Sequence, residues 1–216
     1  MAVSTFAPDR SAESRPTVPA DQARSEGCTA HEHADPRVRR TRKLLLEAFR
    51  SLIHDKPYAE ISVQHITDRA DVNRATFYAH YTDKQDLAIS LVKTDLADAV
   101  FQTFAHKPAF NRQNLILFAG TVITFMGDLY GRCPKAAEHL NAAVSLAVQD
   151  ELYTLAYRWI SQGRAHAELF RGSSREAVAT VIAGSVYGAA YRWIRSGRRQ
   201  TVDDLSRDIV GVIVKA

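Results

Sequence analysis

The sequence has few cysteines, and those it has do not form a ligand set. Among its 216 residues only Cys28 and Cys133 are cysteines, and no metal-ligand spacing relates them. His31 and His33 lie near Cys28, but no second ligand cluster accompanies them to complete a zinc site. So few thiols in a chain of this length favour a reducing cytoplasm over a disulfide-stabilised fold. We expect neither a metal nor a cofactor.

Long apolar runs are also scarce. The first residues, MAVSTFAPDRSAES, lack an apolar core, so we expect no secretory signal. The longest apolar stretch, AVATVIAGSVYGAA at 177–190, is too short for a membrane span and is interrupted by threonine, serine and two glycines. These features predict a cytoplasmic protein with no membrane partner.

Arrangements typical of enzymes are missing too. We find no nucleophile–base pattern and no phosphate-binding loop, and the histidines are scattered along the chain. We therefore expect no enzymatic activity. A helical small-molecule-binding protein or enzyme without sequence-specific DNA binding is the alternative. The net charge of +4 is compatible with a nucleic-acid partner without requiring one.

Strand signals are nearly absent, whereas apolar residues recur at helical spacing. Leu115, Phe118 and Val122, for example, fall on one helical face. The sequence therefore predicts an all-α fold with a small three-helix head and a larger helical body. Residues 1–34, rich in small and charged residues, are expected to be a disordered tail. We place the head at residues 35–83 and the body at 84–216.

The head contains two short predicted helices joined by a tight turn. After a first helix from residue 36 to about residue 53, Ser62 is a suitable N-cap for a helix over 63–70. A joint at Asp71 then leads into a third helix over about 73–78. Two short helices in this order predict a helix-turn-helix, whose second helix enters the DNA major groove.

The third helix carries side chains that suit base edges. Arg74 can donate to guanine O6 and N7, Asn73 can pair with adenine, and the Thr76 methyl group suits a thymine methyl. Flanking side chains able to hold phosphates are Tyr78, His80 and Lys84. An ordinary amphipathic helix with a solvated polar face explains the same spacing, so the motif alone leaves both interpretations open.

The first helix begins with a cluster of cations. Its opening, PRVRRTRK, places Arg37, Arg39, Arg40, Arg42 and Lys43 in the first two turns. The positive end of a helix dipole favours acidic residues instead, so a polyanionic partner would relieve the repulsion. We expect Arg39 and Arg42 to contact DNA. The alternative is a solvated charge cluster that continues the tail.

The run TRKLLLEAF, followed by ISVQHITDRADVNRATFYAHYTDKQDL, resembles the DNA-binding head of the TetR family of bacterial transcriptional regulators. Two positions depart from the family pattern, since Asp71 and Pro57 stand where glycines are usual. Aspartate tolerates a left-handed turn better than most residues, so we expect the turn to persist. The resemblance implies that Phe77 and Tyr81 pack the head. It implies DNA contacts by Ser62, Gln64, Asn73, Arg74, Ala75, Thr76, Tyr78, His80 and Lys84.

The resemblance also implies a homodimer and a ligand pocket in the body. A penultimate helix at about 174–196, apolar on nearly every side, suits burial by a partner, although burial within one subunit is the alternative. Expected interface residues are Val181, Gly184, Ser185, Gly188, Ile209 and Ile213. Expected pocket residues are Phe118, Val122, Phe125, Met126, Tyr130, Tyr153 and Trp159, and an aromatic stripe of this kind also occurs in a plain core.

Taken together, the resemblance implies a ligand-responsive regulator of transcription. Its partners would be a double-stranded DNA operator, a small-molecule effector and a second copy of the chain. The implied mechanism is that of a repressor released from a pseudo-palindromic operator when the effector binds. A sequence-indifferent architectural DNA binder is a further alternative, against which the modest net charge argues.

Overall fold

The computed structural model describes residues 35–104, 109–132, 134–162, 170 and 172–214, without the side chains of 132 and 134–141. The expected tail, residues 1–34, and Cys133 lie outside the described residues. The chain divides into two units, Met1–Arg40 and Thr41–Ala216, which are considered separately. The expected boundary between head and body, near Lys84, falls within the second unit.

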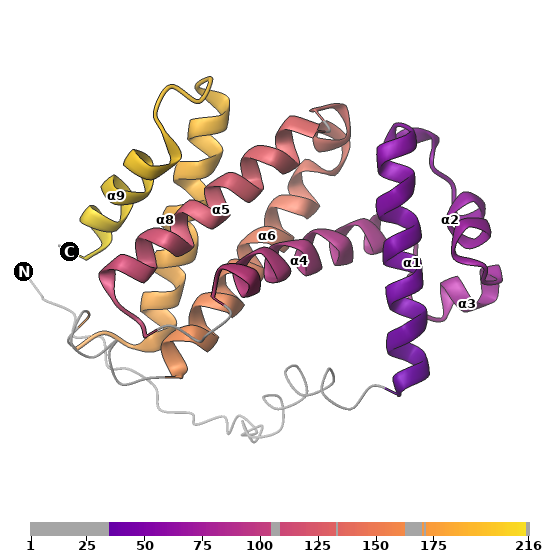
Figure 1. Ribbon diagram of the computed structural model, residues 1–216, viewed down its shortest axis with the longest axis horizontal. Coiled ribbons are helices and arrows are strands. Elements are labelled where there is room, and N and C mark those ends of the chain that lie inside the picture. Colours follow the sequence, from indigo (N-terminus) through magenta and orange to yellow (C-terminus); the bar gives the residue numbers. More distant parts are fainter. Residues whose placement is uncertain (1–34, 105–108, 133, 163–169, 171, 215–216) are drawn as a thin grey trace, which may run out of the picture. The chain divides into compact units, whose positions relative to one another are not determined.

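The described residues form eight α-helices and one short 3-10 helix and contain no strand, which confirms the all-α prediction (Figure 1). The first helix extends slightly further than expected, and the third begins after Asn73. The elements are α1 (Pro36–Asp55), η1 (Tyr58–Glu60), α2 (Val63–Ala70), α3 (Arg74–Tyr78), α4 (Lys84–Thr103), α5 (Arg112–Arg132), α6 (Pro134–Ser161), α8 (Arg175–Arg195) and α9 (Val202–Ile213).

Five of these helices begin at a residue whose side-chain oxygen accepts a backbone N–H from the first turn. Such caps satisfy a donor that the helix itself cannot satisfy, and so fix where the helix starts. The caps are Ser62 for α2, Asn73 for α3, Asp83 for α4, Ser174 for α8 and Thr201 for α9.

α5 is the central helix of the body, and it packs against α4, α6, α8 and α9 (Figure 1). Phe118, Ala119, Val122 and Met126 on this helix are almost completely buried. Within the described chain, α5 is the one helix that is long and apolar enough to cross a membrane by length and composition alone. Only the stretch at 177–190 had been considered in this respect from the sequence. The apolar side chains of α5 lie against neighbouring helices of the same chain.

Candidate nucleic-acid interface

The turn between α2 and α3 depends on Asp71. This residue adopts the left-handed conformation, with φ 53° and ψ 48°, at the C-terminal cap of α2. The next N–H, from Val72, donates to the carbonyl oxygen of Thr67 at 3.1 Å and closes the helix end. Asp71 therefore performs the role of a glycine, which confirms that the turn persists.

One side of α3 is fixed in the core of the head. Phe77 is completely buried, and its ring centroid lies 5.3 Å from that of Tyr78 and 6.0 Å from that of Tyr81. Tyr81 is 2% exposed, so both aromatic residues expected to pack the head do so. Because this side is buried, the opposite side of the helix faces outward, where Arg74 and Ala75 are exposed.

Asn73 has a structural role at the start of α3. Its side-chain oxygen accepts hydrogen bonds from the backbone N–H of Thr76 at 2.7 Å and from the Thr76 hydroxyl at 2.9 Å. A bidentate pairing with adenine uses that same oxygen. The side-chain amide N–H groups of Asn73 are therefore the groups that remain suited to a base.

Arg74 and Tyr78 lie one turn apart on the outward side of α3. The Arg74 guanidinium is 3.5 Å from the Tyr78 hydroxyl, which is at the limit of a hydrogen bond. The Tyr78 side chain is exposed to 51% although its ring contacts Phe77. A large exposed aromatic residue held in place from below suits contact with another molecule.

At the start of α2, His65 has a structural role that the sequence analysis did not assign. His65 Nδ1 accepts the backbone N–H of Ser62 at 3.2 Å, while the Ser62 hydroxyl accepts the backbone N–H of His65. This reciprocal pair is a capping box with histidine in the place of glutamate or glutamine. The signal in the sequence was a cap residue followed, three positions later, by a side chain with an acceptor. On the same helix, Gln64 donates to Asp68 at 2.5 Å.

Arg42 lies over the ring of Tyr81, with its guanidinium carbon 5.3 Å from the ring centroid. Its Nε is 3.5 Å from the Tyr81 hydroxyl. Partial burial, and secondarily the positive charge of Arg42, lower the pKa of His80. Arg39 is exposed in the first unit of the chain.

Lys84 is held inside the head. Its ammonium group donates to the carbonyl oxygens of Tyr58 and Ile61, at 2.9 and 2.6 Å, and lies 4.2 Å from the centroid of the Tyr58 ring. Burial lowers the pKa of Lys84. Two of its three N–H groups are thus engaged within the protein.

The sequence of this chain is similar to those of known transcriptional regulators. Residues 45–91 match the family model described as bacterial regulatory proteins, tetR family. The chain is 27% identical over 151 residues to the HTH-type transcriptional regulator EthR of Mycobacterium tuberculosis, which covers 64% of this chain and 70% of that protein. The segment matched by the family model, residues 45–91, contains α2, α3 and the joint at Asp71. The head of the chain is that of a TetR-family protein.

Two further proteins are similar to this chain, one in sequence and one in structure. The uncharacterized HTH-type transcriptional regulator YxbF of Bacillus subtilis is 37% identical over 67 residues, which are 31% of this chain but only 18% of that protein. Among solved structures, the TetR family repressor AlkX of Dietzia sp. is 15% identical, with a TM-score of 0.58 over 81% of this chain and 93% of the other. That structural likeness supports the shared fold of head and body.

In the body, several of the residues expected to line a pocket contact neighbouring side chains closely. Phe118 packs against Trp159, with ring centroids 5.8 Å apart, and Val122 and Met126 are completely buried. Tyr130 lies 6.3 Å from Tyr191 by ring centroids. Tyr153 stacks on Tyr157 at 5.9 Å. Phe118, Val122 and Met126 therefore belong to the hydrophobic core, and the other aromatic residues pack against it.

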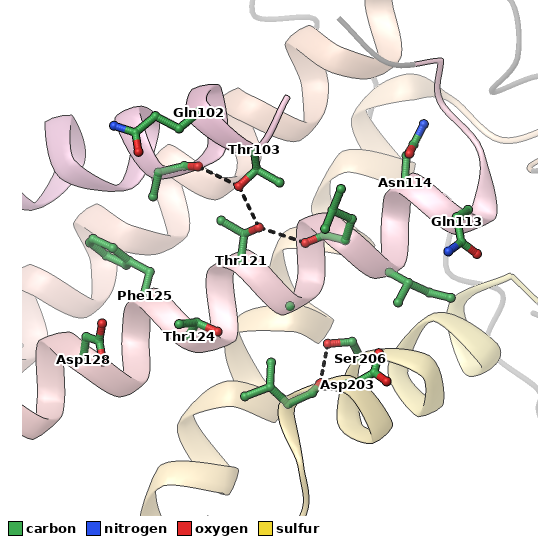
Figure 2. Close-up of a pocket in the computed structure, with 15 residues that line it drawn as sticks. Gln102, Thr103, Gln113, Asn114, Thr121, Thr124, Phe125, Asp128, Asp203 and Ser206 are labelled. Carbon is green, nitrogen blue, oxygen red and sulfur yellow. Dashed lines mark hydrogen bonds between the residues drawn. The ribbon is translucent and has the colours of Figure 1, made fainter. Parts of the chain in front are cut away.

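A groove of about 830 Å³ lies elsewhere, on the outer side of α5 between the end of α4 and the start of α9 (Figure 2). Of the residues expected to line the pocket, Phe125 alone lines this groove. Its other lining residues include Gln102, Thr121 and Ser206. The sequence did not indicate this polar groove, because the residues that line it come from three separate helices.

The residues expected at a dimer interface fall into two groups. Val181 is 51% exposed, Gly184 is exposed, and Ser185 and Gly188 are half-buried on α8. Ile209 and Ile213 are 9% and 4% exposed within a single chain, because they pack into its own core. On the same helix, Val212 is 71% exposed.

Proposed function

We propose that this chain is a sequence-specific, ligand-responsive regulator that binds an operator through α3 and represses transcription. The observation that carries the proposal is the two-sided character of α3. Phe77 fixes one side in the core, and Arg74, Ala75 and Tyr78 stand exposed on a helix start that Asn73 caps. A short, rigid helix with outward polar side chains is what major-groove reading requires.

Within this proposal, the outward residues have separate tasks. Arg74 reads guanine, Asn73 donates from its amide to a base, and Ala75 and Thr76 contact apolar base edges. The phosphates are held by Arg39, Arg42, Ser62, Gln64, Tyr78 and His80. Lys84 supports the interface by holding the loop before α2, because its ammonium group is bound to two carbonyl oxygens there.

The chain is proposed to act as a cytoplasmic homodimer. Val181 and Gly184 on α8 and Val212 on α9 supply exposed small and apolar residues for this interface, and Ser185 and Gly188 on α8 are half-buried. An added Cβ at Gly184 or Gly188 would meet nothing within 4 Å in the single chain. Two recognition helices in a dimer would read half-sites about 34 Å apart on a pseudo-palindromic operator.

Release from DNA is proposed to follow effector binding in the body. α4 starts at Lys84, which binds the head, and it packs against α5 and α6 in the body. Arg50 of α1 also forms an ion pair with Asp95 of α4. An effector that prefers a shifted position of α4 by about 5.5 kcal/mol would change nearly the whole population from DNA-binding to released.

The proposal is tested by selecting DNA fragments from a random pool with the purified full-length chain. The binding of the selected duplex is then measured by fluorescence anisotropy against random competitor DNA, across a salt series. We expect Arg74→Ala to lose about 1–3 kcal/mol of discrimination between the selected and the random duplex.

The control is Arg199→Ala, which removes the same charge from an exposed position outside the head. It should leave discrimination unchanged. Equal binding of selected and random duplexes by the unmodified chain would favour an architectural DNA binder. A chain that selects no DNA at any salt concentration would contradict the regulator and favour a protein that binds small molecules alone.

A further inference from the structure

The groove on the outer side of α5 differs from the packed aromatic residues of the core in its polar groups. Threonine, glutamine and asparagine side chains line it together with apolar residues such as Leu117 and Phe125 (Figure 2). Its volume of about 830 Å³ is that of a site for a drug-sized molecule. The groove thus offers room, an apolar surface and hydrogen-bonding groups in one place.

Charge narrows the class of ligand. Among the described residues that line the groove there is no lysine, arginine or histidine. Asp128 and Asp203 both line it, and the Asp203 carboxylate is paired with Arg207. A carboxylate or phosphate of a ligand would lose its water here without gaining a cation, which is costly. The lining therefore disfavours anions.

Uncharged hydrogen-bonding groups are available instead. Gln102, Gln113 and Thr124 are exposed, and their side chains form no hydrogen bond within the described part of the chain. Gln113 and Thr124 belong to different turns of α5, and Gln102 faces the groove from α4 (Figure 2). A ligand along the groove can therefore meet amide or hydroxyl groups at separate points.

Two further hydroxyl groups lie between these points. Thr103 Oγ1 and Thr121 Oγ1 are 3.2 Å apart, and each is 2.9 Å from the carbonyl oxygen four residues earlier in its own helix. Two hydroxyl hydrogens cannot serve all three contacts at once. When both hydroxyl groups donate to the backbone carbonyl oxygens, no hydrogen lies between Thr103 Oγ1 and Thr121 Oγ1, and these oxygens can accept an N–H or O–H from a ligand.

The groove also touches the helix that carries the head. Ala99, Gln102 and Thr103 are in the last turns of α4, and Lys84, which binds the head, is its first residue. A helix of 20 residues is about 30 Å long and moves largely as one body. Contact with Gln102 or Thr103 therefore bears directly on the element that positions α3.

From these observations we infer that the groove is an effector site for an uncharged amphiphilic small molecule with hydrogen-bond donors. The site is distinct from the aromatic residues inside the body, and the ligand acts on α4 directly at Gln102 and Thr103. The regulatory part of this inference rests on the function proposed above. The binding part does not depend on it.

The test uses N-phenyl-1-naphthylamine, an uncharged dye with one N–H donor whose emission increases in apolar surroundings, with the full-length chain. Thr124→Trp fills the groove from an exposed position, so the core is left intact. Leu146→Trp is the matched control, since Leu146 is 62% exposed on α6 and does not line the groove. We expect saturable binding to the unmodified chain and to the control, and at least about tenfold weaker binding to Thr124→Trp.

The second measurement adds saturating N-phenyl-1-naphthylamine to each protein bound to its selected duplex. The dye should weaken DNA binding by the unmodified chain and by Leu146→Trp, and have no effect on Thr124→Trp. The inference is overturned if the dye does not bind saturably, or if it binds both tryptophan variants alike. It is also overturned if bound dye leaves DNA affinity unchanged, or if Thr124→Trp alters the sedimentation of the protein, since a second copy would then cover the groove. DNA selection without dye reports the proposed function separately.

Discussion

The ammonium group of Lys84 lies 2.6 Å from the carbonyl oxygen of Ile61. Lys84 is the first residue of α4, and Ile61 directly precedes the N-cap of α2. The same ammonium also binds the carbonyl oxygen of Tyr58. The start of the long helix is therefore attached to the loop from which the helix-turn-helix begins, so that displacement of one end of α4 reaches the head through these hydrogen bonds.

Replacing Lys84 by methionine should destabilise the protein. Methionine keeps an unbranched apolar chain near the Tyr58 ring, but it leaves two carbonyl oxygens without this donor. We expect the free energy of unfolding to fall by about 1–3 kcal/mol, measured by urea denaturation followed by circular dichroism. Lys93→Met, at a more peripheral lysine whose ion pair with Asp150 spans 4.0 Å, should change it by less than about 0.5 kcal/mol. Equal effects of the two variants would show that the carbonyl contacts do not stabilise the head.

At Asp71, glycine should be the better residue. The left-handed conformation with φ 53° strains any side chain that has a Cβ atom. We expect Asp71→Gly to raise the free energy of unfolding by about 0.5–1 kcal/mol and Asp71→Val to lower it by more than about 1 kcal/mol. Asp71→Asn is the control and should be close to neutral, because asparagine adopts this conformation readily. Thermal unfolding of the three variants would check the order, and a valine variant as stable as the glycine variant would contradict it.

Alanine at Gly184 should have opposite effects on folding and on self-association. Nothing lies within 4 Å of an added Cβ, so the helix should gain about 0.5–1 kcal/mol in the single chain. The same methyl group should keep a second copy from approaching closely, and thus raise the dimer dissociation constant in sedimentation equilibrium. Gly127→Ala provides the contrast, because its Cβ would lie 3.2 Å from the Trp193 ring and should reduce stability. An unchanged dissociation constant for Gly184→Ala would remove this face from the interface.

His80 should make stability depend on pH in the mildly acidic range. Its pKa in the folded chain is lowered, by burial and then by Arg42, below the ordinary value of 6.5. Between these two pKa values the unfolded chain binds more protons, so the free energy of unfolding rises with pH across that window and falls on acidification. Below the folded pKa this contribution is constant. His80→Asn should lack it, as denaturation curves collected from about pH 5 to pH 8 would show.

Much of the head could be predicted from the sequence because its determinants are local. Ser62 and Asn73 cap the helices that follow them, and each cap is bonded to a backbone N–H three residues away. Phe77 was expected inside the head and is completely buried. The turn at Asp71 required only a residue that tolerates a positive φ. Interactions over three or four residues are visible in a sequence without knowledge of the fold.

In the body, the roles of the apolar residues could not be predicted from the sequence. An apolar residue such as Met126 has the same helical spacing in a packed core as in a pocket lining, so periodicity does not distinguish the two. Ile209 and Ile213 belong to an apolar stripe whose partner, its own subunit or another, depends on how α9 packs. The carbonyl partners of Lys84 are 26 and 23 residues away in sequence, and no local pattern indicates them.

The arrangement of α3 also governs how such a protein can change its target over evolution. Arg74 and Ala75 are exposed and contribute nothing to the core, so substitutions there can alter the preferred DNA sequence without loss of folding stability. Asn73 lacks this freedom, because its side-chain oxygen holds the start of the helix. Viable replacements at Asn73 are limited to serine, threonine, aspartate and other capping residues. Paralogues that diverge in specificity should therefore vary freely at two adjacent positions of the recognition helix and sparingly at the one before them.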